Sequence, residues 1–322
     1  MKRINNKSKI KVFSILLLGL FIVGFISTDV YAATSFTSGL AKGTEEFTVT
    51  NYDDTSWNST VSSLITPNDL FQGDSNITNA KSKITLKGWT QDTWQLYDWL
   101  VSLFFPMFYP SEEIFLLLGI LDLQGYNETT INNDYNSNYT LWYGLRSVWN
   151  FTVNDYEEEP SYIDGIIILQ NPIKYKNVLE DYNHIASNLS GNLAVQMAGF
   201  TFPNFTADEF LWQYALNGFA IAEPQSEYLN EVVDELGCEN ATVSGSTLIF
   251  ERYGFTNYTV EITYGVKGMI SSFTVKDAVD STIFKINSSN SEWIFFLILI
   301  ITTSGVIGLV ILIIIRKRKL KR

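Results

Sequence analysis

The C-terminal segment, residues 293–322, constrains the fold of this chain most strongly. From Ile294 to Ile315 no side chain carries a charge, and these 22 residues would rise by ~33 Å as a helix. That length matches the hydrocarbon core of a bilayer, where only a helix can satisfy the backbone of a single segment. Six Lys or Arg follow within residues 316–322 and mark the cytoplasmic end. The sequence therefore predicts a transmembrane helix at 294–315 and a basic cytoplasmic tail at 316–322.

The N-terminus has the organisation of a signal peptide. Five basic residues precede an apolar stretch of 15 residues, Val12 to Ile26, and Val30-Tyr31-Ala32 then offers a site for signal peptidase. We predict cleavage after Ala32, with an uncleaved signal anchor as the alternative. Together with the C-terminal span, the signal peptide (1–32) predicts a single-pass protein of the cell membrane. Residues 33–293 would lie outside the cell and the C-terminus in the cytoplasm.

The predicted extracellular segment is strongly acidic. Residues 33–293 contain 11 Lys or Arg and 33 Asp or Glu, a net charge of −22. Binding to nucleic acid is disfavoured, because phosphate contacts need clustered basic side chains. A soluble, self-repelling surface and cation binding are both compatible with this charge. The basic tail is different, and we expect it to contact anionic lipid headgroups.

Asn-x-Ser/Thr sequons are spread along the whole extracellular segment, in greater number than its composition would supply by chance. Each is an acceptor for an N-linked glycan and indicates an exposed position. The alternative is an Asn-rich and Thr-rich chain whose sequons are not used. The ten sites are Asn58, Asn76, Asn127, Asn138, Asn150, Asn188, Asn204, Asn240, Asn257 and Asn287.

The residues that most often carry catalysis or bind metals are scarce. Cys238 is the only cysteine and His184 the only histidine, which is too few for an internal disulfide or for a zinc site of His and Cys. Asp134-x-Asn136-x-Asn138 resembles the start of an EF-hand loop but lacks its glycine and distal Glu. We therefore predict no catalytic residues, no cofactor and no metal site. A pair of carboxylates remains as an alternative, because spacing alone cannot select one among so many acids.

Periodicity predicts an α+β fold for residues 33–293, in which an antiparallel sheet carries helical segments packed on one face. Residues 124–140 are expected to form a polar loop. Helices are expected at 112–121 after Ser111, at 175–187, at 210–216 after the Thr206 capping box, and at 227–236 between Ser226 and Gly237. Strands are expected at 47–50, 83–87, 166–169, 247–251, 258–264, 269–276 and 283–286.

Aromatic and aliphatic residues concentrate in Trp89–Leu123. Neither apolar run in this segment approaches the ~20 residues of a membrane span. We expect the segment to form buried core, and the alternative is an exposed patch or groove for an apolar ligand or a partner. The candidate ligand residues are Trp94, Trp99, Phe104, Phe105 and Phe108.

The layout resembles that of archaeal-type single-pass cell-surface glycoproteins. The resemblance rests on Gly39-Leu40-Ala41-Lys42-Gly43 before the first strand, the Lys-rich strand, the Trp-rich segment and the final meander before the anchor. It implies a signal peptide, an ectodomain and a membrane anchor, but no activity. The meander and Trp89–Leu123 are also similar to lipoprotein-carrier folds, in which a curved sheet cups helices over an apolar cavity. The lipid-anchor cysteine of those carriers is missing.

Three functions follow as hypotheses. The first is a membrane-anchored glycoprotein with a binding, adhesion or envelope role, whose protein or lipid ligand is unknown. The second is a carrier or sensor of an apolar ligand held by the Trp and Phe side chains. The third is a surface hydrolase that uses carboxylates. An enclosed apolar cavity lined by Trp94, Trp99 and Phe104 would favour the carrier, and a filled core would favour the binding protein.

Overall fold

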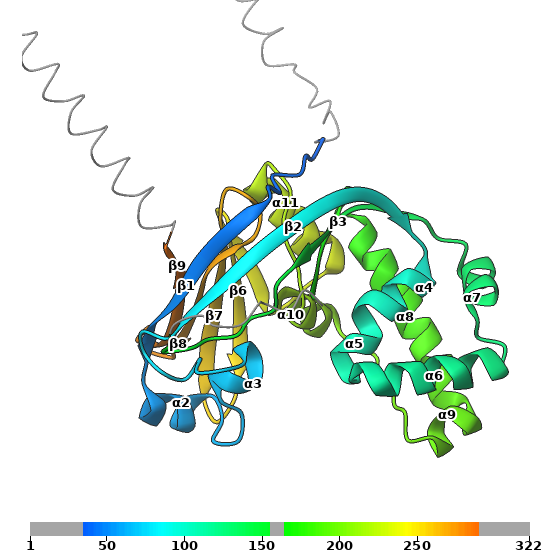
Figure 1. The fold of residues 1–322 in the computed structure, drawn as a ribbon, viewed down its shortest axis with the longest axis horizontal. Helices are drawn as coiled ribbons and strands as arrows, with labels where there is room; N and C mark the ends of the chain where they lie inside the picture. The colour runs from blue at the N-terminus through cyan, green and yellow to red at the C-terminus, as the bar shows by residue number, and fades with distance from the viewer. Residues whose placement is uncertain (1–34, 155–163, 290–322) are drawn as a thin grey trace, which may run out of the picture. The chain divides into compact units, whose positions relative to one another are not determined.

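The computed structural model describes residues 35–154 and 164–289 (Figure 1). The chain divides into two compact units, Met1–Ser35 and Phe36–Arg322, and the described strands and helices belong to the second. The predicted signal peptide (1–32), membrane span (294–315) and basic tail (316–322) lie outside the described residues. Within the described ranges, no helix combines the length and the apolar character that crossing a membrane requires.

One antiparallel sheet is the framework of the second unit. The strands described are β1 (Gly43–Tyr52), β2 (Lys81–Trp94), β3 (Tyr139–Arg146), β4 (Asp164–Leu169), β5 (Ala241–Ser244), β6 (Thr247–Tyr253), β7 (Asn257–Tyr264), β8 (Ile270–Asp277) and β9 (Thr282–Ser288). Their order in the sheet is β4-β3-β2-β1-β9-β8-β7-β6-β5. The sheet is curled, and its long strand β2 bends visibly in Figure 1. With its several helices the unit is α+β, which confirms the predicted class.

Helices are inserted between the strands. Their bounds are α2 (Asp54–Thr60), α3 (Pro67–Phe71), α4 (Leu96–Trp99), the π-helical segment η1 (Leu100–Phe104), α5 (Phe105–Phe108), α6 (Ser111–Leu123), α7 (Glu128–Tyr135), α8 (Lys174–Gly191), α9 (Leu193–Met197), α10 (Ala207–Leu216) and α11 (Gln225–Leu236). The elements α4 to α7 form one insertion between β2 and β3, and α8 to α11 form another between β4 and β5. The small helices α2 and α3 connect β1 to β2.

Two meanders meet at the centre of the sheet. Strands β1 to β4 are neighbours in chain order, and so are β5 to β9. They join where β1 pairs with β9, with Phe47 opposite Ser288 and Tyr52 opposite Phe284. Burial alternates along these strands, as the period of a half-buried strand requires: Phe47 and Val49 of β1 are buried and Thr50 is exposed. The two halves of the sheet therefore depend on a contact between the first and the last described strand.

Four of the predicted helices are confirmed as α6, α8, α10 and α11, and α11 ends as predicted at Gly237, whose φ of 73° is the left-handed conformation glycine favours. Two predicted caps are wrong. The residues before α6 and α11 are Pro110 and Pro224, so Ser111 lies inside its helix and Ser226 lies inside α11. Proline serves here because its fixed φ suits the start of a helix.

The prediction of a polar loop at residues 124–140 is wrong. Helix α7 occupies the middle of this stretch, and strand β3 begins at its end. Asn127 caps α7, since its Oδ1 accepts a hydrogen bond from the backbone N–H of Thr130 at 3.0 Å. Ile131 is the one buried side chain of α7, and a single apolar residue shows no helical period. Strand β2 also runs to Trp94, past the predicted end at residue 87.

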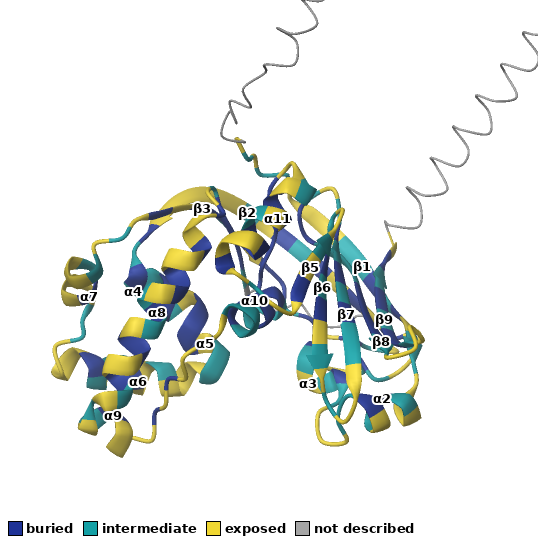
Figure 2. Ribbon diagram, turned by 180° about the vertical axis from the view of Figure 1, so that it is seen from behind, coloured by how far each residue is buried: buried dark blue, intermediate teal, exposed yellow. Residues whose placement is uncertain are grey.

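The core is rich in aromatic side chains. Trp57, Trp99, Phe104 and Tyr182 are among the largest side chains that are fully buried. Figure 2 shows the buried stripe of α8 facing its neighbours, and that stripe includes Tyr182. The Phe104 ring stacks on the Tyr182 ring with centroids 4.0 Å apart. Ring stacking of this kind supplies the stability that a domain without disulfides needs.

Tyrosine hydroxyls cover the free edge of strand β4. The N–H of Ile167 donates to the carbonyl of Gly218, and the carbonyl of Ile167 accepts from the Tyr214 hydroxyl at 2.7 Å. The N–H of Leu169 donates to the Tyr175 hydroxyl, and the carbonyl of Leu169 accepts from the Tyr228 hydroxyl at 2.8 Å. An uncovered edge strand exposes unpaired backbone groups and invites aggregation. Tyrosine side chains from α8, α10 and α11 thus supply hydrogen-bond partners that a further strand would otherwise give to β4.

Alkaline pH is expected to unfold this protein cooperatively. Burial raises the pKa of Tyr175, Tyr214, Tyr228 and Tyr264, while the pKa in the unfolded chain is ~10. A pKa that is higher in the folded state contributes stability that is present below ~pH 10 and lost as pH rises further. Circular dichroism, followed together with tyrosinate absorbance from pH 8 upward, should be lost in one step that coincides with the part of the tyrosinate signal from these buried side chains. A complete tyrosinate signal from a chain that is still folded would contradict this.

Candidate functional site

An open groove of about 740 Å³ lies at one end of the sheet. It lies where β6 and β7 extend beyond the short strand β5, near the start of α10 and the loop that follows α11. Its volume falls within the range of small-molecule sites. The lining residues are Asp208, Asn240, Phe250, Glu251, Arg252, Tyr253, Asn257, Tyr258, Thr259 and Ala278.

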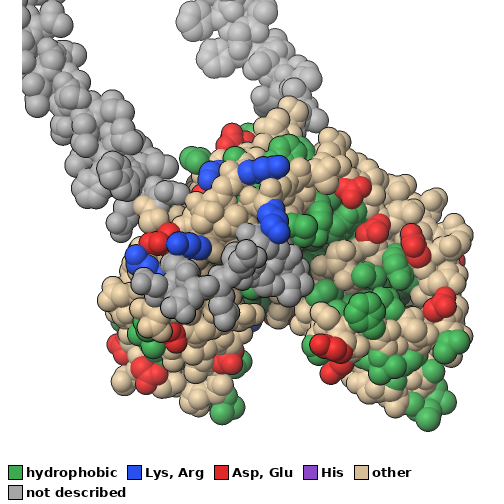
Figure 3. Space-filling model, in the orientation of Figure 1, with side chains coloured by type: hydrophobic (Ala, Val, Ile, Leu, Met, Phe, Trp, Pro, Cys, Tyr) green, Lys and Arg blue, Asp and Glu red, His purple; other side chains and the backbone are tan. Residues whose placement is uncertain are grey.

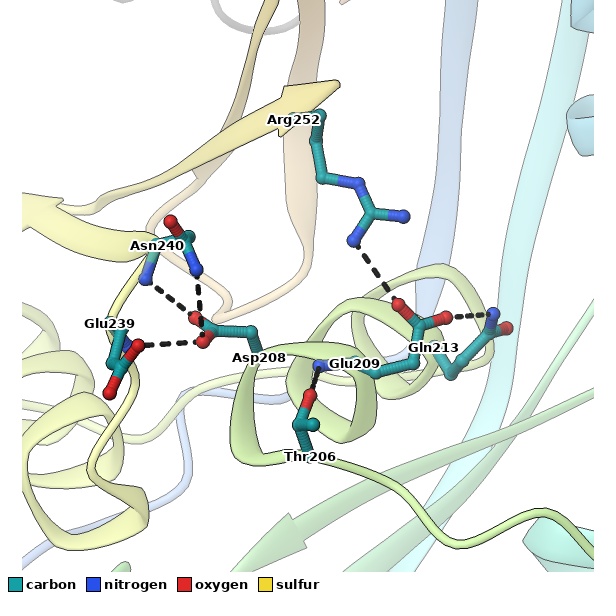
Figure 4. Close-up of polar contacts among 7 residues, drawn as sticks. All are labelled: Thr206, Asp208, Glu209, Gln213, Glu239, Asn240 and Arg252. Carbon is teal, nitrogen blue, oxygen red and sulfur yellow. Dashed lines mark hydrogen bonds and ion pairs between the residues drawn. The ribbon is translucent and has the colours of Figure 1, made fainter. Parts of the chain in front are cut away.

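Asp208 holds one wall of the groove in place (Figure 4). Its carboxylate accepts hydrogen bonds from the backbone N–H of Glu239 at 3.1 Å and of Asn240 at 2.9 Å. The side-chain amide of Asn240 donates to the same carboxylate at 3.4 Å. Helix α10 presents Asp208 in its first turn because Thr206 caps the helix by accepting from the Glu209 N–H. Asp208 therefore positions the loop between α11 and β5.

Arg252 forms the opposite wall. Its Nη1 donates to Glu209 Oε2 at 3.2 Å, and its guanidinium lies 4.6 Å from the centroid of the Trp212 ring. Glu209 Oε1 also accepts from the Gln213 side chain at 2.8 Å, as Figure 4 shows. An arginine that stacks on an aromatic ring and bonds a carboxylate is held in one orientation. The wall is consequently rigid before any ligand arrives.

Aromatic and amide side chains form the accessible part of the groove. Tyr253 is 77% exposed, and it lies opposite Asn257 at the end of the β6–β7 hairpin. Tyr258 lies opposite Arg252 on the neighbouring strand. The turn of this hairpin is fixed, because the backbone N–H groups of Phe255 and Thr256 both donate to the carbonyl of Thr60. The groove thus offers exposed ring faces on a hairpin that does not need to be ordered by binding.

The sequence hypotheses did not identify this groove. One signal was available: Arg252 is the first basic residue after Lys176. A lone cation after a long acidic stretch points to a specific partner, and the structure provides it in Glu209. The Thr206 capping box predicts only the start of a helix, whereas the carboxylate of Glu209 within it contacts Arg252 and Gln213.

All ten sequon asparagines lie in the part of the chain that the structure describes, and none of them is buried. Asn240 and Asn257 line the groove. Four others are partly covered: Asn58, Asn76, Asn127 and Asn287. Six are exposed: Asn138, Asn150, Asn188, Asn204, Asn240 and Asn257. The structure therefore leaves each position accessible to some degree, and glycan attachment remains a prediction.

Four of the five candidate ligand residues are in the core: Trp94, Trp99, Phe104 and Phe105 are buried, and Phe108 is half-buried. The Trp99 ring contacts Trp94, Tyr139 and Tyr214. Phe108 stacks on Phe205. None of the five lines the groove or the small cavity of about 20 Å³ beneath the sheet. This packing is the arrangement that favours a binding protein over an apolar carrier.

The other residues that the sequence analysis considered for catalysis or metal binding lie outside the groove. His184 is exposed on α8 and its ring contacts Tyr135. Burial, with a smaller effect of Asp208, raises the pKa of the Cys238 thiol to about 12, so the reactive thiolate is disfavoured. Asp134 and Asn136 lie at the end of α7. Within residues 35–154 and 164–289, no group of His, Cys, Asp and Glu has the arrangement of a metal site.

Comparison with known proteins adds no relative: no family model, no curated protein and no solved structure matches the chain.

Proposed function

We propose that this protein is a single-pass membrane glycoprotein whose extracellular domain binds a ligand at the cell surface. The membrane arrangement is supported by the sequence: a signal peptide at 1–32, an uncharged span at 294–315 and a basic tail at 316–322. The bilayer, anionic headgroups and N-linked glycans are the partners that these segments imply. The transmembrane helix that the sequence predicts at 294–315 is part of this proposal.

The observation that carries the binding role is the groove between α10 and the β6–β7 hairpin. Hydrogen bonds within the chain hold its walls, and it combines the exposed Tyr253 and the half-buried Tyr258 with amide, carboxylate and guanidinium groups. Ring faces pack against the C–H groups of a sugar ring, while planar polar side chains donate to and accept from its hydroxyl groups. A hydroxyl-rich ligand such as an extracellular saccharide fits these groups best. Few charges on the ligand are needed, because Asp208 and Arg252 already have partners within the chain.

The groove can be tested with the full-length protein in detergent and a panel of saccharides. We expect Tyr253→Ala and Tyr258→Ala each to weaken saccharide binding at least ~10-fold, because an aromatic contact contributes ~1–3 kcal/mol when it is desolvated. Phe115→Ala removes an equally exposed ring on α6 and serves as the matched control. Failure of every saccharide to bind, or binding that survives both tyrosine variants, would remove the support for this ligand class.

The membrane arrangement has its own test on intact cells. Protease added outside should digest residues 33–293 and leave the tail at 316–322 protected. Digestion of the tail alone would show that the chain has the opposite orientation in the membrane. Mass spectrometry of peptides that contain Asn188 or Asn138, which are exposed and lie away from the groove, should show attached glycan. Unmodified asparagine at all ten sequons would rule out the glycoprotein part of the proposal.

A further inference from the structure

Helix α6 carries apolar side chains on more of its surface than the described fold covers. Its buried residues are Leu117 and Leu121. Phe115 and Leu123 are 77% and 84% exposed, and Leu116 is also exposed. Large apolar side chains that lie together on a surface are typical of an interaction site. The exposed face of α6 is thus an apolar surface that the described fold does not use.

Helix α9 extends this surface. It packs against α6, and the Asn192 side chain before it donates to the Gln124 side chain after α6. Leu193 and Met197 of α9 are 69% and 80% exposed. We call the exposed set Phe115, Leu116, Leu123, Leu193 and Met197 the α6–α9 face. Figure 3 shows hydrophobic side chains gathered over these two helices, with acidic side chains among them.

Gly119 gives the α6–α9 face a notch. It lies three or four residues from Leu116, Phe115 and Leu123, and so on the same side of the helix. A Cβ built at Gly119 would meet no atom of the described residues within 4 Å. Glycine in mid-helix costs ~1 kcal/mol relative to alanine, and no packing among the described residues requires it. A notch here leaves room for the backbone of another helix to approach between Phe115 and Leu123.

The charge around the α6–α9 face indicates which kind of partner can bind there. Residues 95–138, which include α6, contain six Asp or Glu and no Lys or Arg. Glu112, Glu113 and Asp122 are exposed beside the apolar side chains. The stretch 177–251, which includes α9, also contains no Lys or Arg. A second copy of the chain would bring acid against acid, whereas a partner with basic residues beside its apolar face complements this surface.

We propose that the α6–α9 face is a docking site for an amphipathic helix of another protein, with leucine-like side chains on one face and Lys or Arg flanking them. Such a helix would bury Phe115, Leu123 and Met197 and place its cations against Glu112, Glu113 and Asp122. This site is separate from the groove, and none of its residues lines that groove. Either site can therefore fail without the other.

The test uses the full-length chain in lipid nanodiscs and three helical peptides of equal length. The first carries leucines on one face flanked by lysines, the second replaces each lysine with glutamate, and the third scrambles the first. We expect the lysine peptide to bind at least tenfold more tightly than the other two, and its affinity to fall as salt is added. Equal binding of the lysine and glutamate peptides would overturn the proposal.

Variants locate the site. The pair Phe115→Ser and Leu123→Ser should weaken the lysine peptide at least tenfold, and Gly119→Leu should do so by filling the notch. Leu64→Ser and Val279→Ser, at side chains 90% and 82% exposed elsewhere, are the matched controls and should change nothing. Gly119→Ala is expected to keep or raise the melting temperature, so loss of binding in Gly119→Leu is not a folding defect.

Three other outcomes would also overturn the proposal. Concentration-dependent self-association that Phe115→Ser abolishes would show that a second copy covers the α6–α9 face. Binding of the chain to protein-free anionic vesicles outside the nanodisc, lost in the same variant, would assign the face to a lipid surface. Peptide binding that the Phe115→Ser, Leu123→Ser and Gly119→Leu variants all retain would place the contact elsewhere on the molecule.

Discussion

Truncation of Phe104 to alanine is expected to lower the free energy of unfolding by ~3–5 kcal/mol. The Phe104 ring is fully buried, stacks on Tyr182 at 4.0 Å and lies 6.0 Å from the Phe210 ring. The rings belong to η1, α8 and α10, so the lost volume lies where three separate elements meet. They cannot all move inward to close the cavity, because each is also tied to other contacts. Urea unfolding followed by tryptophan fluorescence measures the loss.

A matched variant makes the Phe104 result specific. Phe115→Ala removes the same side chain from an exposed position on α6, and it should change the free energy of unfolding by less than ~0.5 kcal/mol. Equal effects of the two variants would mean that Phe104 is not in a close-packed core. An unchanged midpoint in Phe104→Ala would contradict the stacking that joins η1 to α8.

Removing the tyrosine hydroxyl groups that bind the edge of β4 should lower the free energy of unfolding by nearly as much as Phe104→Ala does. Tyr228→Phe removes the donor to the Leu169 carbonyl and the partner of the Tyr175 hydroxyl, which lies 3.0 Å away. Tyr214→Phe removes the donor to the Ile167 carbonyl. Each change leaves a buried carbonyl unsatisfied, at a cost of ~1–3 kcal/mol. We expect the double variant to lose ~2–6 kcal/mol if the two costs add.

Tyr264 supplies the control for these two variants. Its hydroxyl is buried and has no hydrogen-bond partner among the described residues. Tyr264→Phe removes a polar atom that is already unsatisfied, and it should be neutral or stabilise the protein by ~1 kcal/mol. Thermal unfolding of the three variants ranks them directly. A Tyr264→Phe protein as unstable as Tyr228→Phe would show that the loss comes from packing and not from the covered edge.

Local patterns predicted the elements whose signals lie within one segment. The strict alternation of 258–264 predicted β7, and the stripe of Leu229, Val232, Val233 and Leu236 before Gly237 predicted α11. Helix α7 was missed because its apolar pattern is short and its Asn127 cap was interpreted as a sequon. Strand β5 was missed because four residues are too few to show a period.

Local sequence patterns could not predict the candidate site, and the reason is different. Asp208 and Asn240 are 32 residues apart, and Glu209 and Arg252 are 43 apart. No periodicity relates such positions, because their meeting depends on how α10 docks against the end of β6. The same holds for the aromatic side chains of Trp89–Leu123, because packing alone separates the buried Trp99 from the exposed Phe115.

The sequence by itself determined the acidic charge of residues 33–293 and the mixed α+β class, and it predicts the membrane arrangement that we propose. These properties follow from composition and from short-range period, which act within a few residues. Only the tertiary structure decided which carbonyls of β4 the tyrosines cover, where the groove opens and which side of α6 stays uncovered. Those features depend on contacts between segments far apart in the chain. The residues next to a side chain in the sequence do not indicate which distant residue it will contact.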